Sequence, residues 1–273
     1  YNGDLFKFEG MSKDIVLKPH QKNAIARTLL GGNTLLAHEV GAGKTFEMCA
    51  SVMMKKQLGL AHKACIVTPK AVTAQFAAEF YRLYPNAKLL VATESNSGGE
   101  KNKEFFAQAA YGDYDAVICG HDLFKTIPMS YDYRKSFLES EMKEAEEALK
   151  IAAKSGNTKK FSLRGLEQSK KRIAKELEKI YNEVDTKNMS SIPFEDFGFD
   201  ALYVDEAHKY KNLQLFSNHP LAQGSSSYNQ KCGDMIMKCQ YLNHLYNNKA
   251  VTFATGTPIS NSILEMYSMQ KYL

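Results

Sequence analysis

The chain has 273 residues, of which 44% are hydrophobic and 24% charged, with a net charge of +5 and a pI near 8.7. This is an ordinary globular composition, so a largely disordered chain is excluded. The length allows one large α/β domain or two small ones. The mildly basic charge is compatible with a nucleic-acid partner, but an ordinary, slightly basic surface explains it equally well.

Three further features bear on the compartment. No run approaches the roughly 18–20 apolar residues that a membrane-spanning helix needs. The opening residues, YNGDLFKFEG, lack the basic end and apolar core of a signal peptide. The five cysteines include no Cys-x-x-Cys pair, and three of them lie in apolar runs, as buried reduced thiols do. We therefore expect a reducing, cytoplasmic setting without membrane contact or structural zinc.

Short apolar runs alternate with helical patterns along most of the chain. The runs are nearly continuous, as strands covered on both faces require, so the alternation predicts a mostly parallel sheet with helices on both faces. In chain order, the strands are predicted at 34–38, 63–68, 88–92, 115–120, 200–205 and 250–255, and the helices at 43–57, 70–82, 100–110, 228–246 and 258–272.

The segment 134–184 breaks this alternation, because it is rich in Glu, Lys and Ala. It predicts an antiparallel helical hairpin inserted into a domain formed by 1–133 and 185–273. Its charges are expected to form a solvated face, with a partner or nucleic-acid contact as the alternative. Residues 222–229 (AQGSSSYN) are predicted to be a mobile loop. The apolar residues that recur on the two helices are Leu138, Met142, Ala145 and Leu149, then Leu166, Ile173, Leu177, Ile180 and Val184.

The stretch LLAHEVGAGKTFEM nearly matches the phosphate-binding pattern Gly-x4-Gly-Lys-Ser/Thr, but His38 stands where the first Gly belongs. Gly41 and Gly43 would let backbone amides point inward at the start of a helix, whose positive end favours an anion. Lys44 would reach the outer phosphates of a triphosphate, and the Thr45 hydroxyl would hold Mg²⁺. On its own, the motif is also compatible with a chance Gly-Lys-Thr.

A second motif, ALYVDEAH, is an apolar strand that ends in two adjacent carboxylates. If extended geometry continued, Asp205 and Glu206 would point in opposite directions. Asp205 would then hold Mg²⁺ through its water shell, while Glu206 would orient and deprotonate the attacking water. An acidic strand end or a helix cap is the alternative for any single Asp-Glu. Since both motifs would have to arise by chance together, we expect an ATP and Mg²⁺ site.

These motifs resemble motifs I and II of superfamily 2 helicases and translocases of the DEAH type. The later run FATGTPISNSILEMYSMQKYL resembles the Swi/Snf-like branch, whose motif III reads Thr-Gly-Thr-Pro. In that branch the position of His38 commonly carries Asp beside the same Glu, so the missing Gly is a family trait. A packing or capping role is the simplest expectation for His38. The hairpin and the phrase IPFEDFGFDALYVDEAHKYKNL also resemble helicase-type proteins of phages and conjugative elements.

The resemblance implies a RecA-like P-loop lobe with ATP and Mg²⁺ as cofactors. Gln21, in the element before motif I, would read the adenine edge, unless it is a polar residue at a helix start. Lys44, Asp205 and Glu206 would be catalytic, with Thr45 and Asp205 at the metal. The nucleotide would lie on Glu39, Val40, Gly41, Ala42, Gly43, Lys44 and Thr45.

The resemblance also assigns residues to nucleic acid, with duplex DNA as the favoured partner. His208 and Thr255, Gly256 and Thr257 would couple the phosphate end to the nucleic-acid face, with polar packing as the alternative. Thr68, Lys70 and His121 follow predicted strand ends and would contact phosphate groups, giving sequence-independent and salt-sensitive binding. For Lys70, an ordinary surface lysine is the alternative.

Proteins of this family hold ATP between two RecA-like lobes, and the second lobe supplies an arginine finger. The chain stops soon after motif III, so we expect the first lobe alone, with weak ATP binding. A missing finger typically slows turnover by a factor of about 10³–10⁵. Two alternatives stay open: another P-loop ATPase, such as a kinase or assembly ATPase, and a binding module in which the hairpin contacts a partner and the ATP site is vestigial.

Overall fold

The computed structural model describes residues 1–154, 160–183, 192–213, 229–260 and 263–273. Across these residues, six strands form one sheet in the order β1-β6-β5-β2-β4-β3, and every neighbouring pair is parallel. Each strand lies inside one of the predicted ranges, so the expected parallel sheet is confirmed. The strands are β1 (Thr34–Leu36), β2 (Ala64–Thr68), β3 (Leu89–Val91), β4 (Ala116–Gly120), β5 (Ala201–Val204) and β6 (Val251–Ala254).

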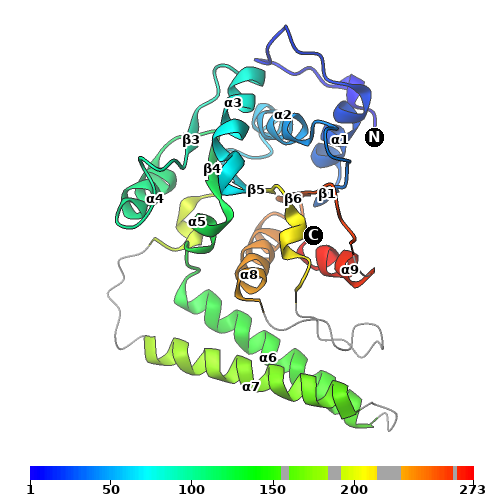
Figure 1. Cartoon of the computed structure of the whole chain (residues 1–273), viewed down its shortest axis with the longest axis vertical. Coiled ribbons are helices and arrows are strands. Elements are labelled where there is room, and N and C mark those ends of the chain that lie inside the picture. The colour runs from blue at the N-terminus through cyan, green and yellow to red at the C-terminus, as the bar shows by residue number, and fades with distance from the viewer. Residues whose placement is uncertain (155–159, 184–191, 214–228, 261–262) are drawn as a thin grey trace.

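Helices cover both faces of the sheet (Figure 1). Successive strand residues point into different cores: Ile66 and Ile118 pack under α1, α2 and α3, whereas Val67 and Val117 pack against α4, α5, α8 and α9. This burial on both faces explains the continuous apolar runs in the sequence. The helices of the lobe are α1 (Pro19–Leu30), α2 (Lys44–Gln57), α3 (Thr73–Leu83), α4 (Lys101–Tyr111), α5 (His121–Lys125), α8 (Gln230–Leu245) and α9 (Ile263–Tyr272).

Two predicted helices begin later than the sequence pattern suggested. The range 70–82 opens with a 3₁₀ turn, η2 (Lys70–Val72), before α3 continues the pattern. The range 258–272 becomes helical only in α9, and residues 255–260 form a loop, in which the Thr255 hydroxyl accepts a hydrogen bond from the backbone of Thr257. In both places, the chain that leaves a strand is held in a turn before its helix begins.

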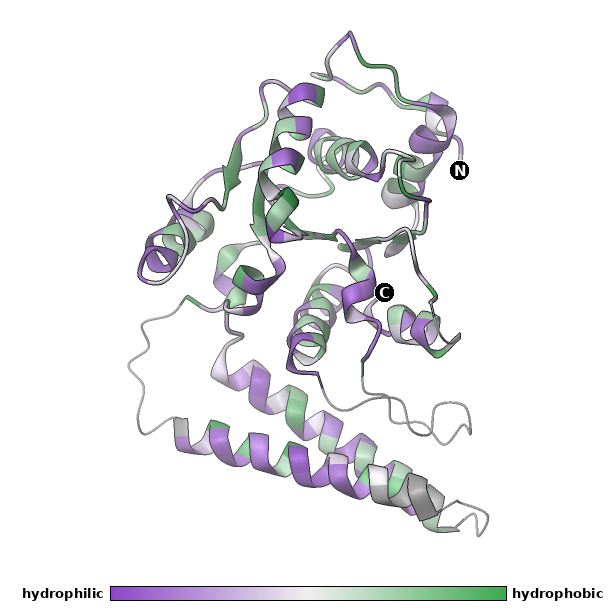
Figure 2. Cartoon of the chain, in the orientation of Figure 1, coloured by the Kyte–Doolittle hydropathy of each residue, from purple (hydrophilic) through white to green (hydrophobic). Residues whose placement is uncertain are grey.

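The predicted hairpin consists of α6 (Tyr131–Lys154) and α7 (Lys160–Glu183), which pack along each other in antiparallel directions (Figure 1). A seam of Leu138, Ala145, Ile173 and Ile180 is buried between them. The outward faces of both helices are largely hydrophilic, in contrast to the sheet (Figure 2). The expected solvated face is therefore present. Val184 lies outside the described residues.

Three further predictions concern the cysteines, membrane-spanning helices and the loop at 222–229. All five cysteines are unpaired and buried. Among the described helices, none is both long and apolar enough to cross a bilayer. The mobile loop predicted at 222–229 lies outside the described residues except for Asn229, whose side chain caps the first turn of α8 by accepting a hydrogen bond from the Lys231 backbone.

Candidate functional site

The loop between β1 and α2 has the backbone that the motif predicts. Gly41 has φ of 85° and Gly43 has φ of 89°, both in the left-handed region that glycine adopts without steric cost. Gly43 is the N-cap of α2, so the helix starts directly at Lys44. The unpaired amides of the first helical turn and the positive end of α2 therefore lie at the loop, which is a favourable position for an anion.

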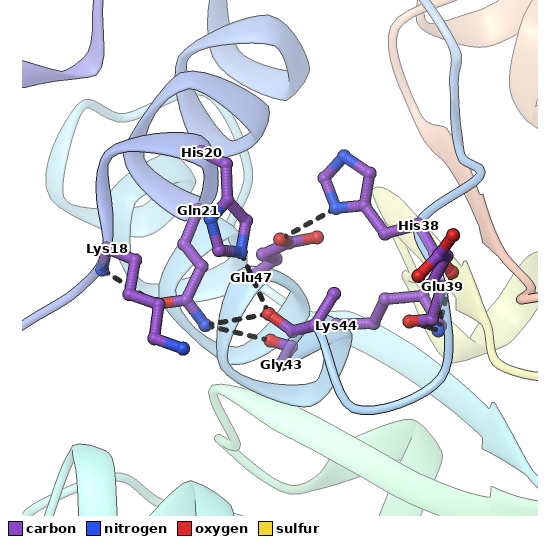
Figure 3. Close-up of polar contacts among 9 residues, drawn as sticks. Lys18, His20, Gln21, His38, Glu39, Gly43, Lys44 and Glu47 are labelled. Atoms are coloured by element: carbon purple, nitrogen blue, oxygen red, sulfur yellow. Dashed lines mark hydrogen bonds and ion pairs between the residues drawn. The ribbon is translucent and has the colours of Figure 1, made fainter.

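Lys44 folds back over this loop (Figure 3). Its Nζ donates hydrogen bonds to the backbone oxygens of His38 at 2.8 Å and Glu39 at 2.9 Å. Both acceptors are neutral carbonyls, which bind an ammonium more weakly than a phosphate oxygen does. An anionic ligand can therefore take the place of these two carbonyls at the Lys44 ammonium.

Gln21 supports the loop from α1 (Figure 3). Its Nε2 donates to the backbone oxygens of Ala42 at 3.3 Å and Gly43 at 3.4 Å, and its Oε1 accepts from the Lys18 amide at 2.8 Å. The side chain is buried, and a Cβ at Gly43 would lie 2.2 Å from Nε2. Both ends of the amide are thus occupied, as the helix-start alternative expects, and the bidentate contact with adenine stays a prediction.

Two residues at this loop were absent from the sequence prediction. His20 lies with its Nε2 3.0 Å from the oxygen of Ala42, next to Gln21. Glu47, in the first turn of α2, is fully buried and lies with its Oε1 2.9 Å from Nδ1 of His38. The sequence held a weak signal for this pair, namely a histidine in place of glycine and an acidic residue nine positions later. The expected packing role of His38 thus takes the form of a contact with the Glu47 carboxyl group.

The carboxylates lie where β5 ends. The Asp205 amide donates to the oxygen of Val67 at 2.8 Å, so the sheet pairing continues to this residue. Glu206 has φ of 51°, a left-handed conformation in which the strand stops and the chain turns into η4 (Ala207–Tyr210). Extended geometry therefore ends at Asp205, and the opposite orientation expected for the two side chains is replaced by a turn. The Asp205 carboxylate accepts the Glu206 amide at 3.0 Å.

One cavity of about 200 Å³ joins the two motifs. Thr45 from α2 and both carboxylates, Asp205 and Glu206, line it, together with Pro69, Val72, Gln75, Phe76 and Glu79. The turn that holds Lys44 and the tip of β5 therefore meet, as the motifs require of a nucleotide site.

The donor set in this cavity fits a magnesium ion. Mg²⁺ binds hydroxyl and carboxylate oxygens and keeps several waters, and Thr45 and Asp205 supply such oxygens. Burial raises the pKa of Asp205, whereas the amide of Glu206 and the charge of Lys44 act in the opposite direction. A divalent cation would favour the ionised carboxylate further.

Motif III contacts both other motifs. Nδ1 of His208, on η4, lies 3.1 Å from Oε2 of Glu206 and 3.2 Å from the hydroxyl of Thr255. Gly256 lies against the apex of the phosphate loop, since an added Cβ would be 3.0 Å from a methyl of Val40. Thr257 donates its amide to the Thr255 hydroxyl at 3.1 Å. The expected coupling residues thus form a continuous set of contacts from the carboxylate to the loop.

Of the three residues expected to contact nucleic acid, two lie beneath the surface. Thr68 is buried, with its hydroxyl 2.9 Å from that of Thr73. His121 is also buried, with Nδ1 2.8 Å from the hydroxyl of Tyr210, and burial lowers the pKa of His121 to about 3. Thr68 is out of reach of a phosphate, and a neutral, enclosed imidazole offers it no charge. The phosphate contacts predicted for Thr68 and His121 are therefore wrong.

Lys70 differs from these two residues because its side chain is exposed. Its Nζ lies 3.9 Å from a Glu94 carboxylate oxygen, at the carboxyl end of β2. A cavity of about 580 Å³ opens here, and its lining includes Lys70, Thr93, Asn102 and Asp122. Such a crevice beyond the carboxyl ends of parallel strands is the usual ligand position in this class of sheet.

Comparison with known proteins adds to this geometry. A family model described as a probable helicase domain matches residues 28–273. The defense against restriction protein B of Escherichia phage P1 is 21% identical over 315 residues, an alignment that covers 100% of this chain and 14% of that protein. The SWI2/SNF2 ATPase core of Sulfolobus solfataricus, solved in complex with dsDNA, shares 14% identity and a TM-score of 0.52, covering 98% of this chain and 37% of that one. The chain therefore spans a small part of the length of each of these relatives, and the RecA-like fold is common to it and the ATPase core.

Proposed function

This chain belongs to the family of probable helicase domains, and we propose that it is the ATP-binding first lobe of a Swi/Snf-like motor that couples ATP hydrolysis to movement on duplex DNA. The observation that carries the proposal is the cavity shared by Thr45, Asp205 and Glu206, next to the loop of Lys44. A fold alone supports many functions, whereas these side chains meet the needs of a bound magnesium nucleotide.

Nucleotide binding begins at Lys44. The triphosphate is a stronger acceptor than the carbonyls of His38 and Glu39, so the ammonium moves from them to the outer phosphates. The loop amides and the positive end of α2 bind the same phosphates. Thr45 and Asp205 would hold Mg²⁺, which would neutralise charge at the phosphates.

Hydrolysis depends on Glu206, which orients the attacking water and accepts its proton. His208 contacts the Glu206 carboxylate and fixes its direction. Because His208 also contacts Thr255, and Gly256 lies on Val40, a change at the phosphates alters motif III as well. This set of contacts is the proposed route from the nucleotide to the DNA-binding face.

Duplex DNA is the proposed partner, and the dsDNA complex of the Sulfolobus ATPase core supports it. The exposed Lys70 is the candidate for a contact with the phosphate backbone, which carries no sequence information and weakens as salt rises. A second RecA-like lobe supplies the arginine finger, so this lobe alone hydrolyses ATP slower by a factor of about 10³–10⁵.

The test is ATP hydrolysis by the complete two-lobed protein with and without duplex DNA. We expect DNA to stimulate hydrolysis, and Glu206→Gln to abolish hydrolysis while leaving MgATP binding intact. Glu178→Gln, the same change on the exposed side of α7, is the matched control and leaves both unchanged. Undiminished hydrolysis in Glu206→Gln would contradict the assigned base, and stimulation by a small metabolite instead of DNA would favour a different P-loop ATPase.

A further inference from the structure

Two side chains that the proposed mechanism does not use meet beside the phosphate loop (Figure 3). His38 follows β1, and Glu47 belongs to the first turn of α2, three residues after Lys44. Nδ1 of His38 lies 2.9 Å from Oε1 of Glu47. The pair therefore joins the two ends of the loop that has to enclose the phosphates.

His38 makes two contacts: its side chain contacts Glu47, and its backbone oxygen accepts a hydrogen bond from Lys44. The Glu47 carboxylate fixes the imidazole, while the His38 oxygen accepts the Lys44 ammonium at 2.8 Å. The usual loop has a glycine at this position, which has no side chain and hence no such attachment. Here the direction of the His38 carbonyl, and with it the resting position of Lys44, depends on Glu47.

Glu47 also places a buried carboxyl group beside the loop. Its side chain has 0% exposure, and its Oε2 has no hydrogen-bond partner among the described residues. A buried carboxylate without a partner would attract Lys44, because residues three apart are neighbours on a helix. The contact with His38 directs the carboxylate away from that competition.

We infer that His38 and Glu47 form a positioning pair, which fixes the entrance of the phosphate loop and keeps Lys44 available for the triphosphate. The inference rests on the proposed function, since it assumes that the loop binds ATP. Both residues act through Lys44 and the loop backbone, so they are positioning residues that do not touch the reacting atoms.

The test is the affinity of the full chain for a fluorescent ATP analogue with Mg²⁺, measured in a double-mutant series. His38→Ala frees Glu47 to pair with Lys44, and we expect roughly tenfold weaker binding. Adding Glu47→Ala to that variant removes the competing charge, so the double variant recovers part of the lost affinity. His38→Asn places an amide donor near the position of Nδ1 and is expected to stay within about twofold of the wild type.

The outcomes separate this inference from the proposed function. The positioning pair would be overturned if the losses of affinity simply added in the double variant, or if His38→Asn did not keep the affinity near that of the wild type. ATP binding by the wild type would still support the proposed function in either case. Glu47→Gln, which keeps an acceptor for His38 without the charge, gives the same answer if His38→Ala does not fold: affinity close to that of the wild type is expected, and a tenfold loss would contradict the pair. A wild-type chain that binds no nucleotide would overturn both.

Discussion

The sheet lobe and the helical hairpin are built on different principles. In the central strands β2, β4, β5 and β6 every residue is buried. The candidate site lies at the carboxyl edge of this sheet, on the turns that follow β1, β5 and β6. In the hairpin, a seam of four buried residues joins two helices whose outer faces are hydrophilic (Figure 2). Side chains that must keep a fixed geometry need a sheet that is packed on both faces. The seam of the hairpin only holds its two helices together.

The first residues of α6 belong to the lobe, and Phe137 of the hairpin packs against the lobe core. The Tyr133 hydroxyl donates to the oxygen of Met237 at 3.3 Å, and its ring lies 5.5 Å from that of Tyr241 on α8. The Ser130 amide donates to the Glu195 carboxylate at 3.1 Å. We therefore propose the division into a lobe of 1–133 and 185–273 and a hairpin of 134–184, and expect each to tolerate damage to the other.

The largest effect is expected when the hairpin seam is broken. Ile173→Asp buries a carboxylate at a fully buried position and should destabilise the hairpin by about 4 kcal/mol. Hydrogen exchange should accelerate in α6 and α7 while MgATP affinity stays unchanged. Lys175→Asp, on the exposed side of the same helix, is the control and should have little effect. A parallel loss of nucleotide affinity in Ile173→Asp would show that the two regions are not independent.

The converse change is Lys44→Ala, which removes the charge that the loop offers to phosphates. We expect MgATP affinity to fall about a hundredfold, because a charge-assisted contact inside an enclosed site is lost. Hydrogen exchange in the hairpin should not change. Calorimetric titration of the nucleotide measures the effect, with Lys175→Ala as the matched lysine control. An affinity for MgATP within threefold of the wild type would show that Lys44 does not bind the phosphates.

Lys55 of the lobe is buried deeply enough to change its titration. Burial lowers the pKa of Lys55 from 10.5 to about 8, and its Nζ donates to the oxygen of Lys249 at 3.0 Å. Between these pKa values the unfolded chain binds more protons than the native one, so this residue makes stability rise with pH. Relative to Lys55→Met, the wild type should gain about 2 kcal/mol between pH 8 and 9.5 in denaturant unfolding. A constant difference across that range would contradict the lowered pKa.

The smallest effect concerns coupling within the lobe. Gly256→Ala places a methyl group 3.0 Å from a methyl of Val40, so the Val40 side chain has to give by a few tenths of an ångström. We expect DNA-stimulated hydrolysis by the complete protein to fall about tenfold, with MgATP affinity within threefold. Combining the change with Val40→Ala should relieve the contact and restore part of the rate. If Val40→Ala restored none of the rate, motif III would not be coupled to the phosphate loop through the contact between Gly256 and Val40.

The elements that the sequence predicted are those with a local signal. Continuous apolar runs located all six strands, and four- and seven-residue spacing located the hairpin, since burial on both faces and a helical seam leave periodic patterns. The two motifs located the turn of Lys44 and the carboxylates of β5 for the same reason: their chemistry depends on residues adjacent in the chain.

The contacts that the sequence did not predict join distant segments. The burial of His121 depends on Tyr210, 89 residues away, and the orientation of the Gln21 amide depends on a loop 21 residues later. Spacing in the sequence carries no information on such packing. The contact between His38 and Glu47 is intermediate, because both residues belong to the recognised motif but their pairing depends on how the strand end approaches α2.

The most direct test of the account is a crystal structure of the chain with Mg²⁺ and a non-hydrolysable ATP analogue. We expect the Lys44 ammonium to leave the carbonyls of His38 and Glu39 for the outer phosphates, and Thr45 and Asp205 would hold the metal. A nucleotide bound elsewhere, with Lys44 still on the two carbonyls, would contradict it.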